Sequence, residues 1–228
     1  MDPGLIFAAA TGLLAGIVHV LIGPDHLAAV APLSVNQRQR TWLTGLWWGI
    51  GHTSGVWAIG LIVFIWREVL PIETLSQWSE RLVGFVLIAL GLWTIRKALN
   101  SRLHYHEHEH DGDRHAHFHL HQKTPAQPHK SQHSHAHAPF GIGILHGLAG
   151  TSHLFGILPA LAFPDTVTAV GYVVGFGVGA IVAMSAFSWA LGQLAQRLID
   201  RSAQALQWLQ YGFSSLAIGV GVAWILFI

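Results

Sequence analysis

Six long apolar stretches alternate with shorter polar segments along the chain. Their approximate bounds are 4–33, 41–66, 81–99, 139–163, 166–195 and 204–228. A helix needs about 20 residues to cross a hydrocarbon core roughly 30 Å thick, and each stretch comes close to that length or exceeds it. Backbone groups inside lipid must be hydrogen-bonded within their own segment, which favours helices. We therefore predict an all-α integral membrane protein with six transmembrane helices.

The first stretch is too long for one straight crossing, because thirty residues at 1.5 Å each would run about 45 Å. It contains Gly23-Pro24, and proline interrupts the hydrogen bonding of a helix interior. We expect a break there. The stretch lacks a basic N-terminal region and a small-residue cleavage site, so we expect a mature helix rather than a signal peptide.

The chain also contains an internal repeat. Residues 16–19 match 143–146 and His26 matches His153 at an offset of 127, and residues 48–51 match 176–179 at an offset of 128. Each half would then hold three crossings, and an odd number of crossings places the halves in opposite orientations, as in many secondary transporters. We predict two inverted three-helix repeats, over residues 1–99 and 139–228.

The segment between the repeats, residues 100–138, has a different composition. It holds twelve of the seventeen histidines and too few apolar residues for a core, so we expect it to be disordered. Closely spaced imidazoles predict weak binding of Ni²⁺, Co²⁺, Zn²⁺ or Cu²⁺. The candidate ligands are His104, His106, His108, His110, His115, His117, His119 and His121. A merely solvated linker is the alternative.

Ten of the twelve lysines and arginines fall in the first, third and fifth connections between spans. Cytoplasmic segments of membrane proteins carry an excess of these residues. We therefore expect a multi-pass protein of the cell (inner) membrane with both termini outside and the histidine-rich segment in the cytoplasm.

Composition excludes several classes of chemistry. Charged residues make up only 10% of the chain and hydrophobic residues 52%. The chain has no cysteine and two methionines, which excludes disulfides, thiolate sites and a thioether path for Cu(I). A net charge of +1 gives no reason to expect nucleic acid as a partner. The sequence shows no recurring combination of a catalytic nucleophile with a general base, so we do not expect an enzyme.

Six ionisable residues lie inside or at the edge of the apolar spans, where such residues are costly and mark functional sites. They are His19, Asp25, His26, His52, His146 and His153. Imidazole nitrogens with one carboxylate oxygen suit nickel, cobalt or zinc better than magnesium or calcium. Histidines that merely hydrogen-bond between helices, or that relay protons, are the alternatives.

Two motifs carry a family resemblance. Residues 19–29, which begin at His19 and include Asp25-His26, are followed by Gly51-His52-Thr-Ser. Together they resemble the signature helices of the nickel/cobalt transporter superfamily, and in particular its short branch of urease-accessory-like nickel permeases. Residues 146–153, with a histidine at each end, also fit that branch. Five residues separate His19 from Asp25, where the superfamily pattern has four.

The resemblance implies that His19, Asp25, His26 and His52 recognise the metal, with His146 and His153 carried over from the second half. At the repeat offsets Ser152 replaces Asp25 and Ala180 replaces His52. Metal binding should therefore be weighted toward the first half.

The resulting expectation is a secondary transporter for Ni²⁺, and for Co²⁺ as a second substrate, with uptake favoured and no tightly bound cofactor. Its partners would be the metal ion, the lipid bilayer and, as the resemblance implies, cytoplasmic nickel chaperones of urease or hydrogenase. Three alternatives remain open. They are an exporter of the same superfamily, a membrane metallochaperone or sensor that moves no ion, and a membrane enzyme or redox conduit that uses the histidines for haem or protons.

Overall fold

The computed structural model describes residues 2–35, 40–66, 72–100, 102–110, 113–121, 137–148 and 156–227. This part of the chain holds seven α-helices, one short 3₁₀ helix and one two-stranded sheet. The elements are α1 (Pro3–Ile22), α2 (Pro24–Val35), α3 (Thr41–Trp66), α4 (Ile72–Asn100), β1 (Arg102–His110), β2 (Asp113–His121), α5 (His137–Leu148), η1 (Leu158–Ala162), α7 (Thr166–Arg201) and α8 (Ala203–Phe227).

The first apolar stretch breaks where its Gly-Pro pair predicts. α1 ends at Ile22, and Gly23 adopts an extended backbone conformation while its N–H donates to the carbonyl of His19. Pro24 then opens α2, where its missing N–H costs no helical hydrogen bond. The two pieces are therefore separate helices joined by one residue.

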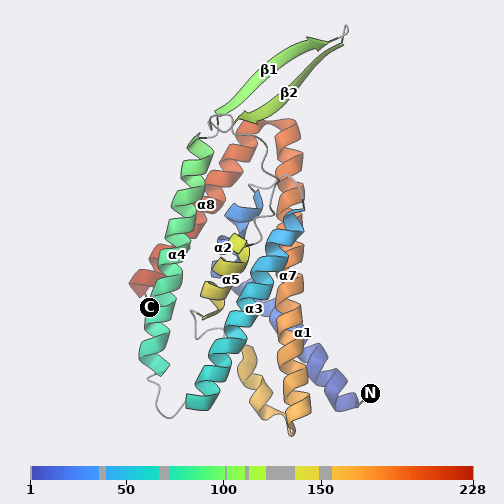
Figure 1. Ribbon diagram of the computed structural model, residues 1–228, viewed down its shortest axis with the longest axis vertical. Coiled ribbons are helices and arrows are strands. Elements are labelled where there is room, and N and C mark those ends of the chain that lie inside the picture. Colours follow the sequence, from blue (N-terminus) through green and yellow to red (C-terminus); the bar gives the residue numbers. More distant parts are fainter. Residues whose placement is uncertain are drawn as a thin grey trace.

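Figure 1 shows the long helices side by side, with the β1–β2 hairpin projecting from one end of the bundle. At that end α2, α4 and α7 finish and α3 and α8 start, while α1, α4 and α7 start toward the opposite end. The short helix α5 lies in the middle of the bundle.

The outer surface of the helices is apolar, as expected for a membrane protein. Phe7, Ile22, Leu161, Trp208 and Phe227 are between 64% and 84% exposed. Among the described residues, four helical segments are long and apolar enough to cross a membrane: Pro3–Ile22, Glu80–Leu99, Thr166–Ile199 and Gln204–Phe227. The chain is a helical, multi-pass membrane protein.

Two of the six predicted spans are not among these four segments. α3 has 26 residues and contains His52 and four hydroxyl residues. The stretch 139–163 is not one described helix: α5 has only 12 residues and η1 only 5, and residues 149–155 lie outside the described part. The count of six transmembrane helices therefore stays a prediction, with four candidate spans found among the described residues.

Glycines let pairs of helices approach closely. A Cβ atom on Gly16 of α1 would collide with the carbonyl of Phe176 in α7, and one on Gly143 of α5 would collide with the carbonyl of Trp48 in α3. Small residues at such crossings are typical of membrane helices. Hydrogen bonds between helices add to this packing, as between the hydroxyls of Ser34 and Ser188 at 2.9 Å.

The histidine-rich segment, for which we expect disorder, holds two strands in its described part. Residues 102–110 and 113–121 form an antiparallel pair, with Arg102 opposite His121 and His110 opposite Asp113. Histidine recurs there mostly at every second residue, and a period of two is the period of a β-strand. Residues 122–136 lie outside the described part.

Candidate functional site

The break between α1 and α2 brings together two histidines that one continuous helix would hold about 10 Å apart along its axis. His19 lies in the last turn of α1, and His26 lies in the first turn of α2. Their ring centroids are 4.7 Å apart, with the ring planes at 80°. A Cβ at Gly23 would collide with the ring of His26 and lie 3.0 Å from Oδ1 of Asp25. Only glycine fits at this joint without displacing those side chains.

α3 and α5 each add one histidine to this pair. The ring of His52 lies 4.9 Å from His26 and 6.0 Å from His19, measured between centroids. The ring of His146 lies 5.0 Å from His26 and 5.7 Å from His52. Four imidazoles from four helices therefore converge, and His146 comes from the second half of the chain.

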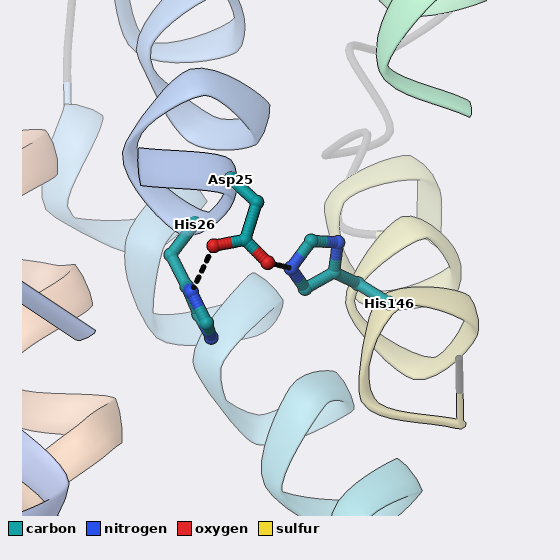
Figure 2. Close-up of polar contacts among 3 residues, drawn as sticks. All are labelled: Asp25, His26 and His146. Atoms are coloured by element: carbon teal, nitrogen blue, oxygen red, sulfur yellow. Dashed lines mark hydrogen bonds and ion pairs between the residues drawn. The ribbon is translucent and has the colours of Figure 1, made fainter. Parts of the chain in front are cut away.

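Asp25 joins two of these histidines through its two carboxylate oxygens. Oδ1 lies 3.0 Å from Nδ1 of His26, and Oδ2 lies 3.2 Å from Nε2 of His146. Figure 2 shows the carboxylate between the two rings, with Asp25 and His26 on one helix and His146 on another. Asp25 follows the helix break directly and is buried in the bundle.

The cluster is almost fully withdrawn from the surface. Asp25 is 5% exposed, His26 1%, His52 0% and His146 2%. A buried carboxylate is costly unless it is paired with hydrogen-bond donors or a cation, and here both oxygens face imidazole nitrogens. The cluster therefore concentrates one carboxylate and several nitrogen donors in a place with little water.

These donors form two groups that could hold a metal ion within the described part of the chain. One consists of His19, His26 and His52, and the other of Asp25, His26 and His146; within each group the ligand atoms lie within 4.8 Å of one another. Nitrogen and carboxylate donors suit borderline divalent ions such as Ni²⁺, Co²⁺ and Zn²⁺. Chemically, the cluster can replace part of the water shell of such an ion.

Two aromatic residues enclose the cluster, and the site prediction missed both. Trp48 is fully buried, and its ring stacks on His52 at 5.0 Å and 14° and lies 5.2 Å from His146. The ring of Phe176 in α7 lies 5.3 Å from His19. The repeat analysis aligned these two residues, and that alignment was the available signal for their shared role.

The structure brings together five of the six predicted membrane-embedded site residues: His19, Asp25, His26, His52 and His146. The sixth, His153, lies outside the described residues. The eight predicted loop ligands fall on β1 and β2, whose backbone is described but whose side chains are not. Metal binding by all fourteen predicted site residues stays a prediction.

Comparison with known proteins gives both a family and relatives. Residues 7–223 match the family model described as the cytochrome c biogenesis protein transmembrane region. The chain is 31% identical over 200 residues to the urease accessory protein UreH of Bacillus sp. (strain TB-90), covering 82% of this chain and 77% of that protein.

Two plant proteins of Arabidopsis thaliana are also similar. Chloroplast protein FOR GROWTH AND FERTILITY 2 is 30% identical and FOR GROWTH AND FERTILITY 1 is 31% identical, each over 220 residues or 96% of this chain. The chain spans only 56% and 59% of their respective lengths. No solved structure matches the chain.

Proposed function

The chain belongs to the family of the cytochrome c biogenesis protein transmembrane region, and from that premise we propose that it is a secondary transporter that moves Ni²⁺, and Co²⁺ as a second substrate, across the cell membrane. The observation that carries the proposal is the buried cluster of one carboxylate and four imidazoles at a helix break. The ion is the substrate and binds transiently, and no tightly bound cofactor is proposed.

The helix break favours transport over a purely structural role for the histidines. A polar bridge between two helices needs only one or two side chains, whereas this cluster gathers five from four helices. Secondary transporters commonly place their ion sites at interrupted membrane helices, where the negative end of a half-helix faces the cation. His19 occupies that end of α1.

Nickel is supported by the donor set and by one relative. Imidazole and carboxylate donors favour Ni²⁺ and Co²⁺ over Mg²⁺ and Ca²⁺. The relative named urease accessory protein points to the same metal, because urease is a nickel enzyme. Cytoplasmic nickel chaperones of urease or hydrogenase are the proposed acceptors of the ion.

The glycine contacts support two inverted repeats as the architecture of the transporter. Gly16 packs on the carbonyl of Phe176, and Gly143 packs on the carbonyl of Trp48. Gly143 follows Gly16 by the repeat offset of 127, and Phe176 follows Trp48 by the repeat offset of 128. The second contact is therefore the first one with the two halves of the chain exchanged. Such an exchange is expected when a pseudo-twofold axis relates α1 and α7 to α5 and α3.

Uptake into the cytoplasm is the proposed direction. The bundle end that carries the hairpin is the end where most lysine and arginine residues flank the helices, which favours a cytoplasmic location for it. A membrane potential of 100 mV, negative inside, supplies about 2.3 kcal/mol per charge, or roughly twice that for a divalent ion. Histidines of residues 104–121 would then hold the ion on the side of release.

The test is uptake of radioactive Ni²⁺ by cells that express the wild type, His26→Ala, or a chain whose loop histidines from 104 to 135 are all serine. His137→Ala is the matched control, because His137 is exposed and lies nine residues before His146 in α5. We expect His26→Ala to abolish accumulation, the loop variant to lower it only partly, and His137→Ala to match the wild type.

Each alternative function predicts a different pattern of Ni²⁺ accumulation among these strains. An exporter would leave less Ni²⁺ in expressing cells than in empty cells, and His26→Ala would restore the level. A metallochaperone or sensor would lose function in the loop variant and keep it in His26→Ala. Equal accumulation in all strains would refute nickel transport.

The family description favours a second candidate, a redox or haem conduit. The chain has no cysteine, so its own residues cannot carry out thiol–disulfide exchange. Ring centroids of 4.7–5.7 Å between His26, His146 and their neighbours leave no space for a macrocycle between two axial histidines. A purified protein with a haem absorption band would favour this candidate, and a colourless protein would exclude haem.

A further inference from the structure

The donors of the cluster form two overlapping groups rather than one. Among the described residues, His19, His26 and His52 form the first group and Asp25, His26 and His146 the second, and His26 alone belongs to both. We propose that these are two alternative positions for a single transported ion, and that the ion passes from one to the other by exchanging ligands around His26. This inference rests on the proposed function and specifies how its site works.

The ring geometry supports the first position, which consists of three imidazoles and no carboxylate. The rings of His19 and His52 are nearly parallel, at 18°, and His26 stands almost perpendicular to both, at 80° and 82°. One ring nitrogen of each of these histidines lies within 4.8 Å of a ring nitrogen of the other two. His19 is the most exposed of the three, so this position is the more accessible one.

Asp25 supports that position without binding the ion directly. When Nδ1 of His26 donates to Oδ1 of Asp25, the lone pair of the neutral ring is on Nε2, and this is the nitrogen that can bind a cation. A carboxylate behind a metal-binding histidine fixes the ring orientation and raises its basicity. Asp25 therefore holds His26 in place for an ion bound with His19 and His52.

The second position differs in charge and in depth. All three of its donors are buried, and Asp25 provides a full negative charge against the divalent ion. An ion there replaces the contacts of Asp25 with His26 and His146, at 3.0 Å and 3.2 Å in the structure. Binding there requires the neutral tautomers of His26 and His146 whose proton is on the nitrogen facing away from Asp25, Nε2 of His26 and Nδ1 of His146, so each ring keeps one proton.

The two positions exclude each other because each needs His26. The full chain should accordingly bind one ion in the cluster. Removing a donor that belongs to one position should leave the other position intact. Removing His26 should damage both.

The test uses Ni²⁺ as the probe on the full chain, purified in detergent, with the loop histidines from 104 to 135 changed to serine. Calorimetric titration gives the affinity, and X-ray absorption at the nickel edge gives the number of imidazole and carboxylate ligands. The variants are His19→Ala, His146→Ala and His26→Ala, with His137→Ala as the exposed control.

We expect His19→Ala and His146→Ala each to bind one Ni²⁺ with less than about a tenfold loss of affinity, and His26→Ala to lose about a hundredfold or more. In His146→Ala the ion should have three imidazoles and no carboxylate, and in His19→Ala two imidazoles and a carboxylate. Both single variants should lose transport, because the ion can no longer pass between positions.

Loss of binding in either single variant, or a carboxylate ligand in both, would overturn the two positions in favour of one composite site. Transport by the wild type would still stand in that case, so the two proposals fail separately. If an alanine variant does not fold, the same measurement is made on His19→Gln or His146→Gln in its place. A wild-type cluster that binds no Ni²⁺ would refute the proposed function itself.

Discussion

At the scale of single residues, Gly23 controls the site more directly than its lack of a side chain suggests. It is the one residue between α1 and α2, and its backbone N–H donates a hydrogen bond to the carbonyl of His19 in the last turn of α1. Any larger residue there would place a Cβ against His26 and Asp25. The geometry of the two ligand groups thus depends on a position that binds no ion itself.

Gly23→Ala should therefore impair the site while leaving the fold intact. We expect Ni²⁺ affinity to fall about tenfold to a hundredfold, because the added methyl group displaces His26, which both ligand groups share. Affinity is measured by titration and folding by thermal unfolding in detergent.

Gly212→Ala in α8 is the matched control, since a Cβ there meets no atom within 4 Å. It should leave the affinity unchanged and should not lower the melting temperature. Equal affinity for Gly23→Ala and the wild type would contradict the role assigned to this joint.

At the scale of single elements, α7 shows how a long helix begins at the edge of the membrane. Its N-cap is Asp165, which accepts hydrogen bonds from Oγ1 of Thr168 at 2.6 Å and from N of Thr168 at 2.9 Å. These bonds from Thr168 hold the pKa of Asp165 below its ordinary value. The side chain is outside the apolar span, which begins at Thr166.

The cap makes the start of α7 sensitive to acid. Because the folded pKa of Asp165 is lowered, its stabilising effect is present above the ordinary pKa and is lost as pH falls through the folded value. Asp165→Ala should lower the melting temperature near neutral pH, and the difference from the wild type should narrow in acid as the charge-dependent part of the cap is lost. Melting curves from pH 7 down to about pH 3 measure this.

Asp165→Asn separates charge from capping. Asparagine caps helices about as well as aspartate but does not titrate. Its melting temperature should therefore stay above that of Asp165→Ala by a constant margin at every pH. An Asp165→Ala penalty that does not change with pH would show that the carboxylate charge is irrelevant to the cap.

At the scale of the whole molecule, helix direction and charge together determine which side each end faces. α4 and α7 run toward the hairpin end and α3 and α8 run away from it. The hairpin and the end of α7 consequently share one side of the membrane, and Asp165, at the start of α7, lies on the other. This arrangement is what the uptake proposal requires.

The absence of native cysteine allows a direct test of that orientation. In intact cells a membrane-impermeant maleimide should label Asp165→Cys, and should label Asp113→Cys only after lysis, because β2 would face the cytoplasm. Gel shift or mass spectrometry measures the labelled fraction. The opposite pattern would place the hairpin outside and favour export or an inverted topology.

Much of the site followed from residue type and spacing. Ionisable residues within apolar stretches identified His19, Asp25, His26, His52 and His146, and the structure brings these side chains together. The reason is the cost of burying charge in lipid, which leaves few residues to choose from. The same rule gave no means of finding Trp48, because a buried aromatic residue is ordinary in any membrane helix.

The alternation of apolar and polar segments determined that the chain is a helical membrane protein, because backbone groups in lipid must be hydrogen-bonded locally. Gly23-Pro24 determined that the first apolar stretch is interrupted, because proline disrupts the local hydrogen bonds of a helix. Only the tertiary structure decided that His146 pairs with Asp25 across 121 residues of sequence, and that His26 belongs to two ligand groups. Those facts depend on how α1, α2, α3 and α5 pack. Packing is set by contacts between distant segments, which no local pattern records.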